Sequence, residues 1–141
     1  MTFKKLTPVI PVEAVEPCLP FWERLGFAKT VEVPEGDPSA AGGSLGAGKL
    51  GFVILVKDGV EVMYQSRASI AKDFPALAQG DFRSNTTLFI EVQGLDEIIA
   101  KLKGVEVVVP ERKTFYGSRE IGGREPGGSL VVFAEFEQAK K

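Results

Sequence analysis

Residues 86–104, TTLFIEVQGLDEIIAKLKG, decide the fold of this chain. The first part, TTLFIEV, is rich in the β-branched and aromatic residues that favour a strand. The second part, GLDEIIAKLK, repeats apolar residues every three or four positions, which is typical of one face of a short amphipathic helix. Gly104 follows where such a helix ends. The stretch therefore predicts a strand followed at once by a helix.

The same pattern occurs once before in the chain. Residues 7–12 read Thr-x4-Val and precede a predicted helix that ends at Gly26, and residues 87–92 read Thr-x4-Val and precede the helix that ends at Gly104. Three β-rich runs follow each helix: 27–33, 50–56 and 60–65 after the first, and 105–109, 115–122 and 129–136 after the second. The chain therefore predicts an internal duplication of a strand-helix-strand-strand-strand unit.

This pattern predicts an α+β fold of two tandem βαβββ modules within a single domain, residues 1–141. The modules are expected at about 4–66 and 85–137, with a helical linker over 67–84 that is interrupted at Pro75. Asp-Gly at 58–59 predicts a tight hairpin between two strands of the first module. The stretch 34–48, PEGDPSAAGGSLGAG, predicts a long, flexible loop that is a candidate flap.

Composition excludes several classes of protein. The chain has 141 residues, one Cys and a formal net charge of −2. One Cys permits no internal disulfide, and the near-neutral charge argues against nucleic acid or an anionic membrane as a partner. The longest apolar stretch, 52–56, is too short to span a bilayer, so we expect a cytoplasmic protein.

The chain contains no His. A Ser-His-Asp or Cys-His nucleophile pair, an HExxH zinc helix and a two-histidine iron site are therefore excluded. Any enzyme built on this sequence would depend on carboxylates, Lys, Arg, Tyr or the single thiol.

Two segments carry a resemblance to a known family. Residues 21–27, Phe-Trp-x2-Leu-Gly-Phe, are similar to its FY-x-x-LGF helix end, and residues 115–120, FYGSRE, with the turn 125–128, EPGG, are similar to its YG-x-RE and DP-x-G pattern. In a duplicated chain this order resembles the vicinal oxygen chelate superfamily, which includes glyoxalase I, extradiol dioxygenases and bleomycin-resistance proteins. The resemblance covers nearly the whole chain and implies two curved half-sheets around a cleft.

The positions that hold the metal ion in enzymes of this superfamily correspond by alignment to Thr7, Met63, Thr87 and Val132. None of these is a His, Asp or Glu, so the resemblance implies no metal site and no cofactor. It points to the bleomycin-resistance branch, whose members bind and sequester a bulky drug-like or aromatic ligand. A homodimer is expected on the same ground.

The expected ligand-binding residues lie on strands and on one turn. Alternation along the strands places eight of them on the concave face: Thr7, Val9, Met63, Gln65, Thr87, Phe89, Leu130 and Val132. Three more are expected at the rim: Phe115, Tyr116 and Arg119. For Arg119 an ion pair with Glu120 or Glu125 is the more common arrangement, and clamping a carboxylate or a flat ring is the alternative. Trp22 is expected to be half-buried or to lie at a subunit interface.

Two alternative functions remain open at this point. One is a lyase or isomerase of the same superfamily that acts without a His-ligated metal, with Tyr116, Glu61 and Glu91 as the candidate catalytic residues. The other is a structural or regulatory dimer in which the cleft has collapsed.

Overall fold

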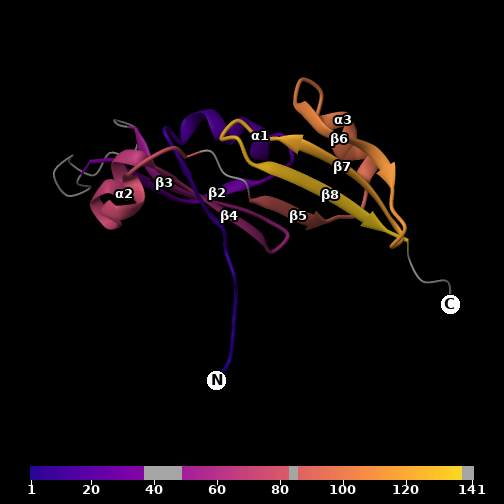
Figure 1. Cartoon of the computed structure of the whole chain (residues 1–141), viewed down its shortest axis with the longest axis horizontal. Coiled ribbons are helices and arrows are strands. Elements are labelled where there is room, and N and C mark those ends of the chain that lie inside the picture. The colour runs from indigo at the N-terminus through magenta and orange to yellow at the C-terminus, as the bar shows by residue number, and fades with distance from the viewer. Residues whose placement is uncertain (37–48, 83–85, 138–141) are drawn as a thin grey trace. The chain divides into compact units, whose positions relative to one another are not determined.

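The computed structural model describes residues 1–36, 49–82 and 86–137. The chain divides into two compact units, Met1–Phe82 (unit 1) and Arg83–Lys141 (unit 2). Each unit contains a four-stranded mixed sheet and short helices (Figure 1). The predicted α+β fold of two βαβββ modules is therefore confirmed.

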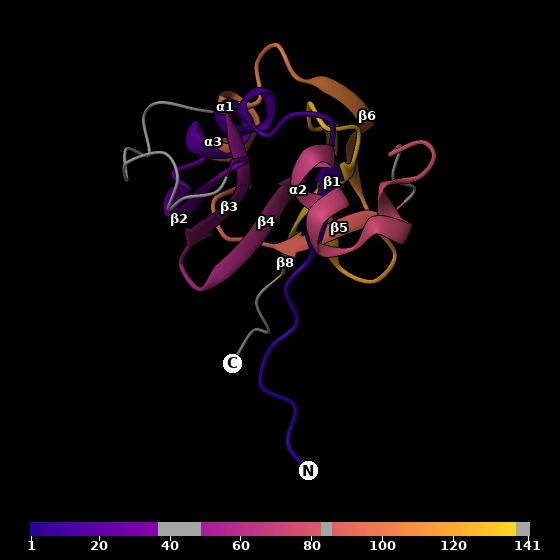
Figure 2. The same cartoon turned by 90° about the vertical axis from the view of Figure 1, so that its left-hand side faces the viewer.

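Unit 1 contains the first βαβββ module and the linker helices. Its elements are β1 (Val9–Val12), the 3-10 helix η1 (Glu16–Cys18), α1 (Leu19–Glu23), β2 (Ala28–Pro34), β3 (Leu50–Lys57), β4 (Val60–Ser66), α2 (Arg67–Asp73) and the 3-10 helix η2 (Pro75–Ala78). The strand order is β1-β4-β3-β2, with β1 parallel to β4 and the other pairs antiparallel. Helix α2 packs at the end of this sheet against β1, β3 and β4 (Figure 2).

Unit 2 repeats the same arrangement. Its elements are β5 (Thr87–Glu91), α3 (Leu95–Lys101), β6 (Glu106–Lys113), β7 (Ser118–Arg124) and β8 (Leu130–Phe136). The strand order β5-β8-β7-β6 is visible from bottom to top in Figure 1, and β5 runs parallel to β8. Each position in the first sheet therefore has a counterpart in the second.

Several local predictions are confirmed. Gly26 and Gly104 follow α1 and α3 with φ of +97° and +85°, values that favour glycine because it has no Cβ. Asp58 and Gly59 form the hairpin turn between β3 and β4, both with positive φ. Pro75 begins η2 and separates it from α2.

Three predicted boundaries are wrong. The run 4–12, KKLTPVIPV, with its two prolines predicts an edge strand; β1 does lie at the sheet edge and pairs with β4 alone, but it begins only at Val9. Strand β6 continues to Lys113 instead of ending at residue 109. Strand β7 begins at Ser118 rather than at Phe115, because residues 115–117 form the turn after β6, closed by the Gly117 N–H donating to the Thr114 carbonyl at 3.3 Å.

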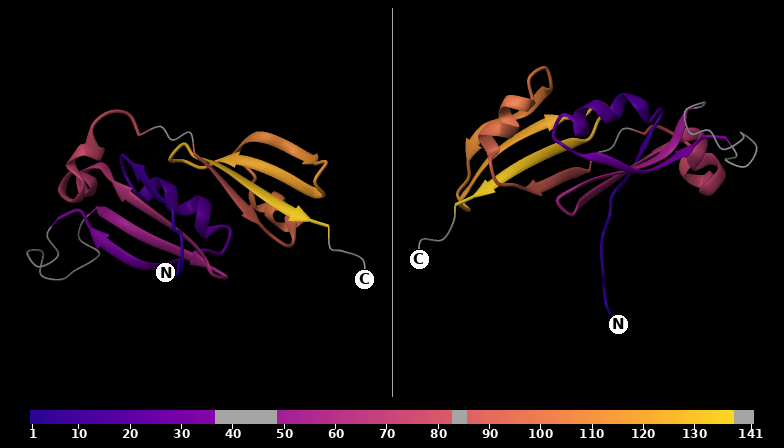
Figure 3. Two further views of the ribbon diagram at one scale, coloured as in Figure 1. Left: turned by 60° about the horizontal axis from the view of Figure 1, so that its bottom comes forward. Right: turned by 180° about the vertical axis from the view of Figure 1, so that it is seen from behind.

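Helix α1 lies across the unit 1 sheet (left view of Figure 3) and brings Trp22 into the core. Trp22 is 0 % exposed, and its indole N–H donates to the Tyr64 hydroxyl on β4 at 2.7 Å. Phe21 and Phe27 meet the Trp22 ring edge-on at 5.1 and 4.9 Å between centroids. The prediction of a half-buried or interfacial Trp22 is therefore wrong: the indole belongs to the core because a hydroxyl inside the unit satisfies its N–H.

The predicted flap over residues 34–48 falls mostly outside the described residues, which resume at residue 49. Among the helices that the structure describes, none is long and apolar enough to cross a membrane.

Candidate functional site

The two faces of the unit 2 sheet differ because only one of them is covered by the start of helix α3. The Glu135 carboxylate accepts hydrogen bonds from the N–H groups of Gly94 and Leu95 at 3.0 and 3.2 Å, which places the start of α3 over the face to which Glu135 points. Because side chains alternate along a strand, Val132, Ala134 and Phe136 point to the opposite face. We call the side under α3 the helix face and the opposite side the far face.

Four aromatic rings on or beside the far face contact one another in sequence. Phe89 on β5 lies 6.4 Å from Phe136 at the end of β8, Phe136 lies 6.2 Å from Tyr116 in the β6–β7 turn, and Tyr116 lies 5.1 Å from Phe115, all between ring centroids. We call these four residues the aromatic strip. Phe89, Tyr116 and Phe115 are 53 %, 45 % and 100 % exposed. The strip is therefore a row of aromatic rings, three of them widely exposed, that extends from the edge strand β5 to the β6–β7 turn.

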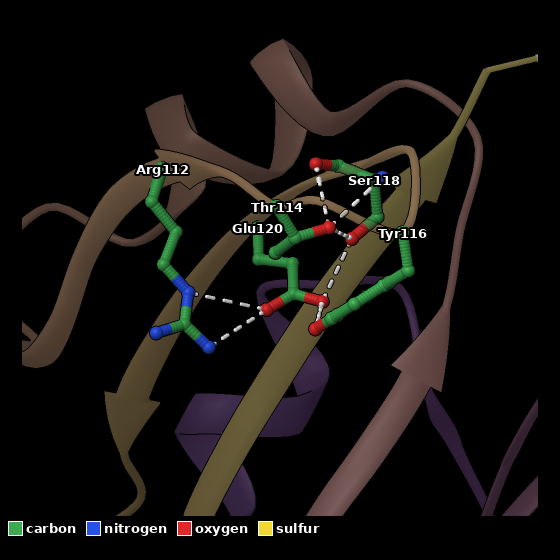
Figure 4. A network of polar contacts seen from close by, with 5 residues as sticks. All are labelled: Arg112, Thr114, Tyr116, Ser118 and Glu120. Carbon is green, nitrogen blue, oxygen red and sulfur yellow. Dashed lines mark hydrogen bonds and ion pairs between the residues drawn. The ribbon is translucent and has the colours of Figure 1, made fainter.

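A buried carboxylate holds the Tyr116 ring in this strip. Glu120 on β7 is 1 % exposed, and its Oε2 accepts hydrogen bonds from the Tyr116 hydroxyl at 2.5 Å and from the Ser118 hydroxyl at 2.8 Å (Figure 4). Its Oε1 accepts from the guanidinium of Arg112 on β6, with Nη2 at 3.1 Å and Nε at 3.3 Å. Thr114 extends the network, since its hydroxyl lies 2.7 Å from that of Ser118.

The network decides the charge state of Glu120. Burial raises the pKa of the Glu120 carboxyl, but hydrogen bonds from Tyr116, Ser118 and Arg112, together with the Arg112 charge, outweigh burial and hold that pKa below its ordinary value. Glu120 is therefore a carboxylate at neutral pH, and the Tyr116 hydroxyl is its donor. This bond restricts the Tyr116 ring, because both ends of the side chain are held.

The expected ligand-binding residues of unit 2 divide between the two faces. The register Thr87↔Leu130 and Phe89↔Val132 places these four on the far face with the strip. Arg119 lies on the helix face, where it pairs with Asp96 at 2.9 Å, Glu111 at 3.6 Å and Glu135 at 3.7 Å. The predicted partners of Arg119, Glu120 and Glu125, are wrong, because its guanidinium pairs instead with carboxylates of α3, β6 and β8.

A hollow of about 550 Å³ lies where β7 begins and β8 ends. Lys113, Arg119 and Glu135 line it from the helix face, and Phe136 and Ser118 belong to the far-face side. It is an open recess beside the end of the strip, lined by both polar and apolar surface.

The expected residues of unit 1 also share one face. In the β1–β4 ladder Val9 pairs with Met63, and Gln65 lies two positions after Met63 on the same face of β4. Val9 is 48 % exposed. Gln65 is only 5 % exposed, because its side-chain amide donates to Ser69 and Asp73 of α2 at 3.0 and 2.8 Å. Contacts within unit 1 therefore already satisfy the Gln65 amide nitrogen.

The candidate catalytic residues lie in different surroundings. Glu61 in unit 1 accepts hydrogen bonds from Lys5 at 2.6 Å and from Thr7 at 3.4 Å, which explains the position of Thr7. Glu91 ends β5 in unit 2 and is exposed on the far face. Tyr116 donates to Glu120. The structure thus couples Tyr116 to Glu120, a residue that the sequence did not single out.

Sequence reasoning missed Phe136 and Glu120 as site residues. The alternation that selects Val132 also selects Phe136, four residues further along β8, so this signal was present in the sequence. Glu120 ends the FYGSRE segment that carries the family resemblance, but nothing in the sequence indicated its burial, which depends on Arg112 and Tyr116 from outside its own strand.

Within residues 1–36, 49–82 and 86–137, no group of three or more His, Cys, Asp or Glu side chains is arranged to hold a metal ion. The positions that correspond to the metal ligands of the superfamily's enzymes are occupied by Thr7, Met63, Thr87 and Val132.

No protein-family model matches the sequence, and no curated protein matches it. Solved structures do match. TioX from Micromonospora sp. ML1 is 16 % identical with a TM-score of 0.72, covering 96 % of this chain and 100 % of TioX. A glyoxalase/bleomycin resistance protein/dioxygenase from Nocardioides is 17 % identical with a TM-score of 0.68, covering 100 % of this chain and 89 % of that one.

A third match is the bleomycin-binding protein of Streptomyces verticillus, solved with copper(II)-bleomycin. It is 21 % identical with a TM-score of 0.60, covering 97 % of this chain and 99 % of that one. At these identities the likeness concerns the fold. The duplicated sheets and these matches together show that this chain has the glyoxalase/bleomycin-resistance fold.

Proposed function

We propose that this protein is a metal-free small-molecule binder of the bleomycin-resistance type, which sequesters a flat aromatic or drug-like ligand. The observation that carries the proposal is the aromatic strip on the far face of unit 2. Phe89 and Tyr116 are about half exposed there, although each lies within 6.4 Å of the Phe136 ring.

Exposed rings that touch one another favour a flat partner. Fully covering one large apolar side chain gains roughly 1.5–3 kcal/mol, and stacked or edge-on rings add about 0.5–1.5 kcal/mol. The Glu120 bond to Tyr116 lowers the entropy cost of binding, because one ring of the strip is already held in place. A flat ligand that covered several rings of the strip would gain these favourable contributions to the binding free energy together.

The solved structures support the same function. Two matches with this fold are described as bleomycin-binding proteins complexed with bleomycin or copper(II)-bleomycin. The aromatic strip supplies a reason, within this chain, to extend ligand binding to it. The homodimer and the closing of the site by a second sheet remain predictions, which sedimentation of the protein with and without ligand tests.

The direct test uses bleomycin and 2-naphthylmethanol as probes, with binding followed by two-dimensional NMR of nitrogen-labelled protein. We expect signals of residues around the strip to shift, and Phe89→Ala or Tyr116→Ala to weaken binding about tenfold, the loss of roughly 1.4 kcal/mol. Phe74→Ala is the matched control, because Phe74 is 56 % exposed in unit 1 and lies outside the strip.

Three outcomes would contradict the proposal. Neither probe binds, or both strip variants bind as tightly as the unchanged protein, or Phe74→Ala weakens binding as much as they do. Recording the ligand's own spectrum over hours tests the alternative enzyme, since a bound probe that is chemically converted would favour a lyase or isomerase.

A further inference from the structure

The charged side chains on the far face of unit 2 are paired with one exception. Arg112 pairs with Glu120 at 3.1 Å, and Arg124 pairs with Glu106 at 3.5 Å. The ladder register places both pairs on the far face, since Arg112 lies opposite Glu120 and Glu106 opposite Arg124. Glu91 is the remaining charge, and within the described part of the chain no ion pair involves it.

Glu91 lies next to the aromatic strip. It stands two residues after Phe89 on the same face of β5, roughly 6.8 Å further along the strand. Its neighbour across the ladder is Ala134, which is fully buried, and Phe136 follows two positions later on β8. The Glu91 side chain is exposed, so a ligand lying on the strip can reach its carboxylate from solvent.

The two carboxylates near Ala134 act differently on a ligand. Glu120 lies opposite Ala134 on the other side, but it is buried and its charge is compensated by Arg112. Glu91 is exposed, and no basic side chain among the described residues pairs with it. The faces of aromatic rings are also negative and attract cations. The rings and Glu91 therefore favour the same sign of charge in a ligand.

We propose that the far face of unit 2 selects flat ligands that carry a positive charge, such as an aromatic ring with a protonated amine or a quaternary ammonium group. Glu91 is the residue that determines this specificity. The ring system lies on Phe89, Phe136 and Tyr116, and the cationic group lies over Glu91. This inference rests on the proposed function and adds the charge class of the ligand to it.

The test compares three probes that share one ring system. They are 2-naphthylmethylammonium, 2-naphthylmethanol and 2-naphthoate, which are cationic, neutral and anionic at neutral pH. For the unchanged protein we expect the cation to bind about fivefold to tenfold more tightly than the alcohol, the sum of an exposed cation–π contact and an exposed ion pair. The naphthoate is expected to bind more weakly than the alcohol.

Glu91→Gln keeps the shape of the side chain and removes its charge. We expect the preference of this variant for the cation over the alcohol to fall to about twofold, the part that the cation–π contact with the rings supplies, while its affinity for the alcohol is unchanged. Glu97→Gln is the matched control: Glu97 lies on α3, is 77 % exposed and is i,i+4 to Lys101, so the variant changes the net charge equally but away from the far face. It should keep the full preference for the cation.

Raising the salt concentration gives a second measurement. An exposed charge pair is screened, so the preference of the unchanged protein for the cation should shrink between 0.01 and 1 M NaCl, as the Debye length falls from about 30 to about 3 Å. The affinity for the alcohol should change little.

Equal binding of the three probes by the unchanged protein would overturn the charge inference and leave the proposed function standing. A preference for the cation that is undiminished in Glu91→Gln would also overturn it. If none of the three probes binds and bleomycin does not bind either, the proposed function fails as well, so the two failures are distinguishable.

Discussion

Units 1 and 2 share one strand order, but they use their aromatic side chains differently. In unit 1 the ring cluster of Phe21, Trp22 and Phe27 is buried with helix α1. In unit 2 the aromatic strip lies on the side of the sheet away from α3, and two of its rings are about half exposed. The same backbone arrangement thus supports a stabilising cluster in one copy and a candidate binding surface in the other.

The chain's two tyrosines show the difference most directly. Tyr64 in unit 1 is 0 % exposed, and its hydroxyl accepts the Trp22 N–H. Tyr116 in unit 2 is 45 % exposed, and its hydroxyl donates to the buried Glu120. In the first case a hydrogen bond completes a core, and in the second a hydrogen bond holds a surface ring in position. An exposed ring that is already held in one orientation lowers the entropy cost of binding a ligand, so such a ring favours a binding site.

The largest effect is expected from removing the indole of unit 1. Trp22→Ala should lower the free energy of unfolding by about 3–5 kcal/mol, because it opens a cavity and leaves Tyr64 without its donor. Phe115→Ala, which truncates a ring that is 100 % exposed, should change it by less than about 0.5 kcal/mol. Urea denaturation followed by circular dichroism measures both, and similar losses would remove the contrast between the two ring clusters.

A smaller difference is expected when each tyrosine loses only its hydroxyl. Tyr64→Phe strands the buried Trp22 N–H and should cost about 1–3 kcal/mol, whereas Tyr116→Phe removes one of several donors to Glu120 and should cost about 0.5–1.5 kcal/mol. Tyr116→Phe should weaken ligand binding while Tyr64→Phe should not. The comparison of the two units is wrong if the order of these losses is reversed.

The smallest effect is expected on the pH dependence of the free energy of unfolding, when Glu120 loses its charge. The pKa of Glu120 lies below its unfolded value of about 4.5, so its contribution to stability is present above that value and is lost as the pH falls through the folded pKa. The sign follows because the unfolded chain binds the proton more readily. Glu120→Gln should therefore flatten the fall of stability below pH 4.5, whereas Glu106→Gln, at a position 68 % exposed and paired only with Arg124, should leave it unchanged. Equal slopes in all three proteins would contradict the folded-state carboxylate.

Most of the fold was predictable because its signals are local. Apolar residues at helical spacing placed α1 and α3, glycine placed their ends, and Asp58-Gly59 placed the first hairpin. The boundary errors occurred where a neighbouring strand decides the outcome: β1 starts at Val9 because its pairing with β4 starts there.

The candidate site was predictable only in part. Strand alternation selected Phe89 and Val132 and would also have selected Phe136. It did not place Arg119, whose partners are on α3, β6 and β8, and it did not indicate that Glu120 is buried. These features depend on residues brought together from separate elements.

The sequence by itself determined the duplicated order of elements, the absence of imidazole and the face on which each strand residue lies, because strand and helix periods act between neighbours in the chain. Only the tertiary structure decided that Trp22 belongs to the core, that Arg119 lies under α3 and that Glu120 holds Tyr116 in an exposed aromatic strip. The outcomes for Trp22 and Glu120 depend on the desolvation of a polar group, and the outcome for Arg119 depends on carboxylates from three other elements. Both are set by what lies against the group in space rather than by its place in the chain.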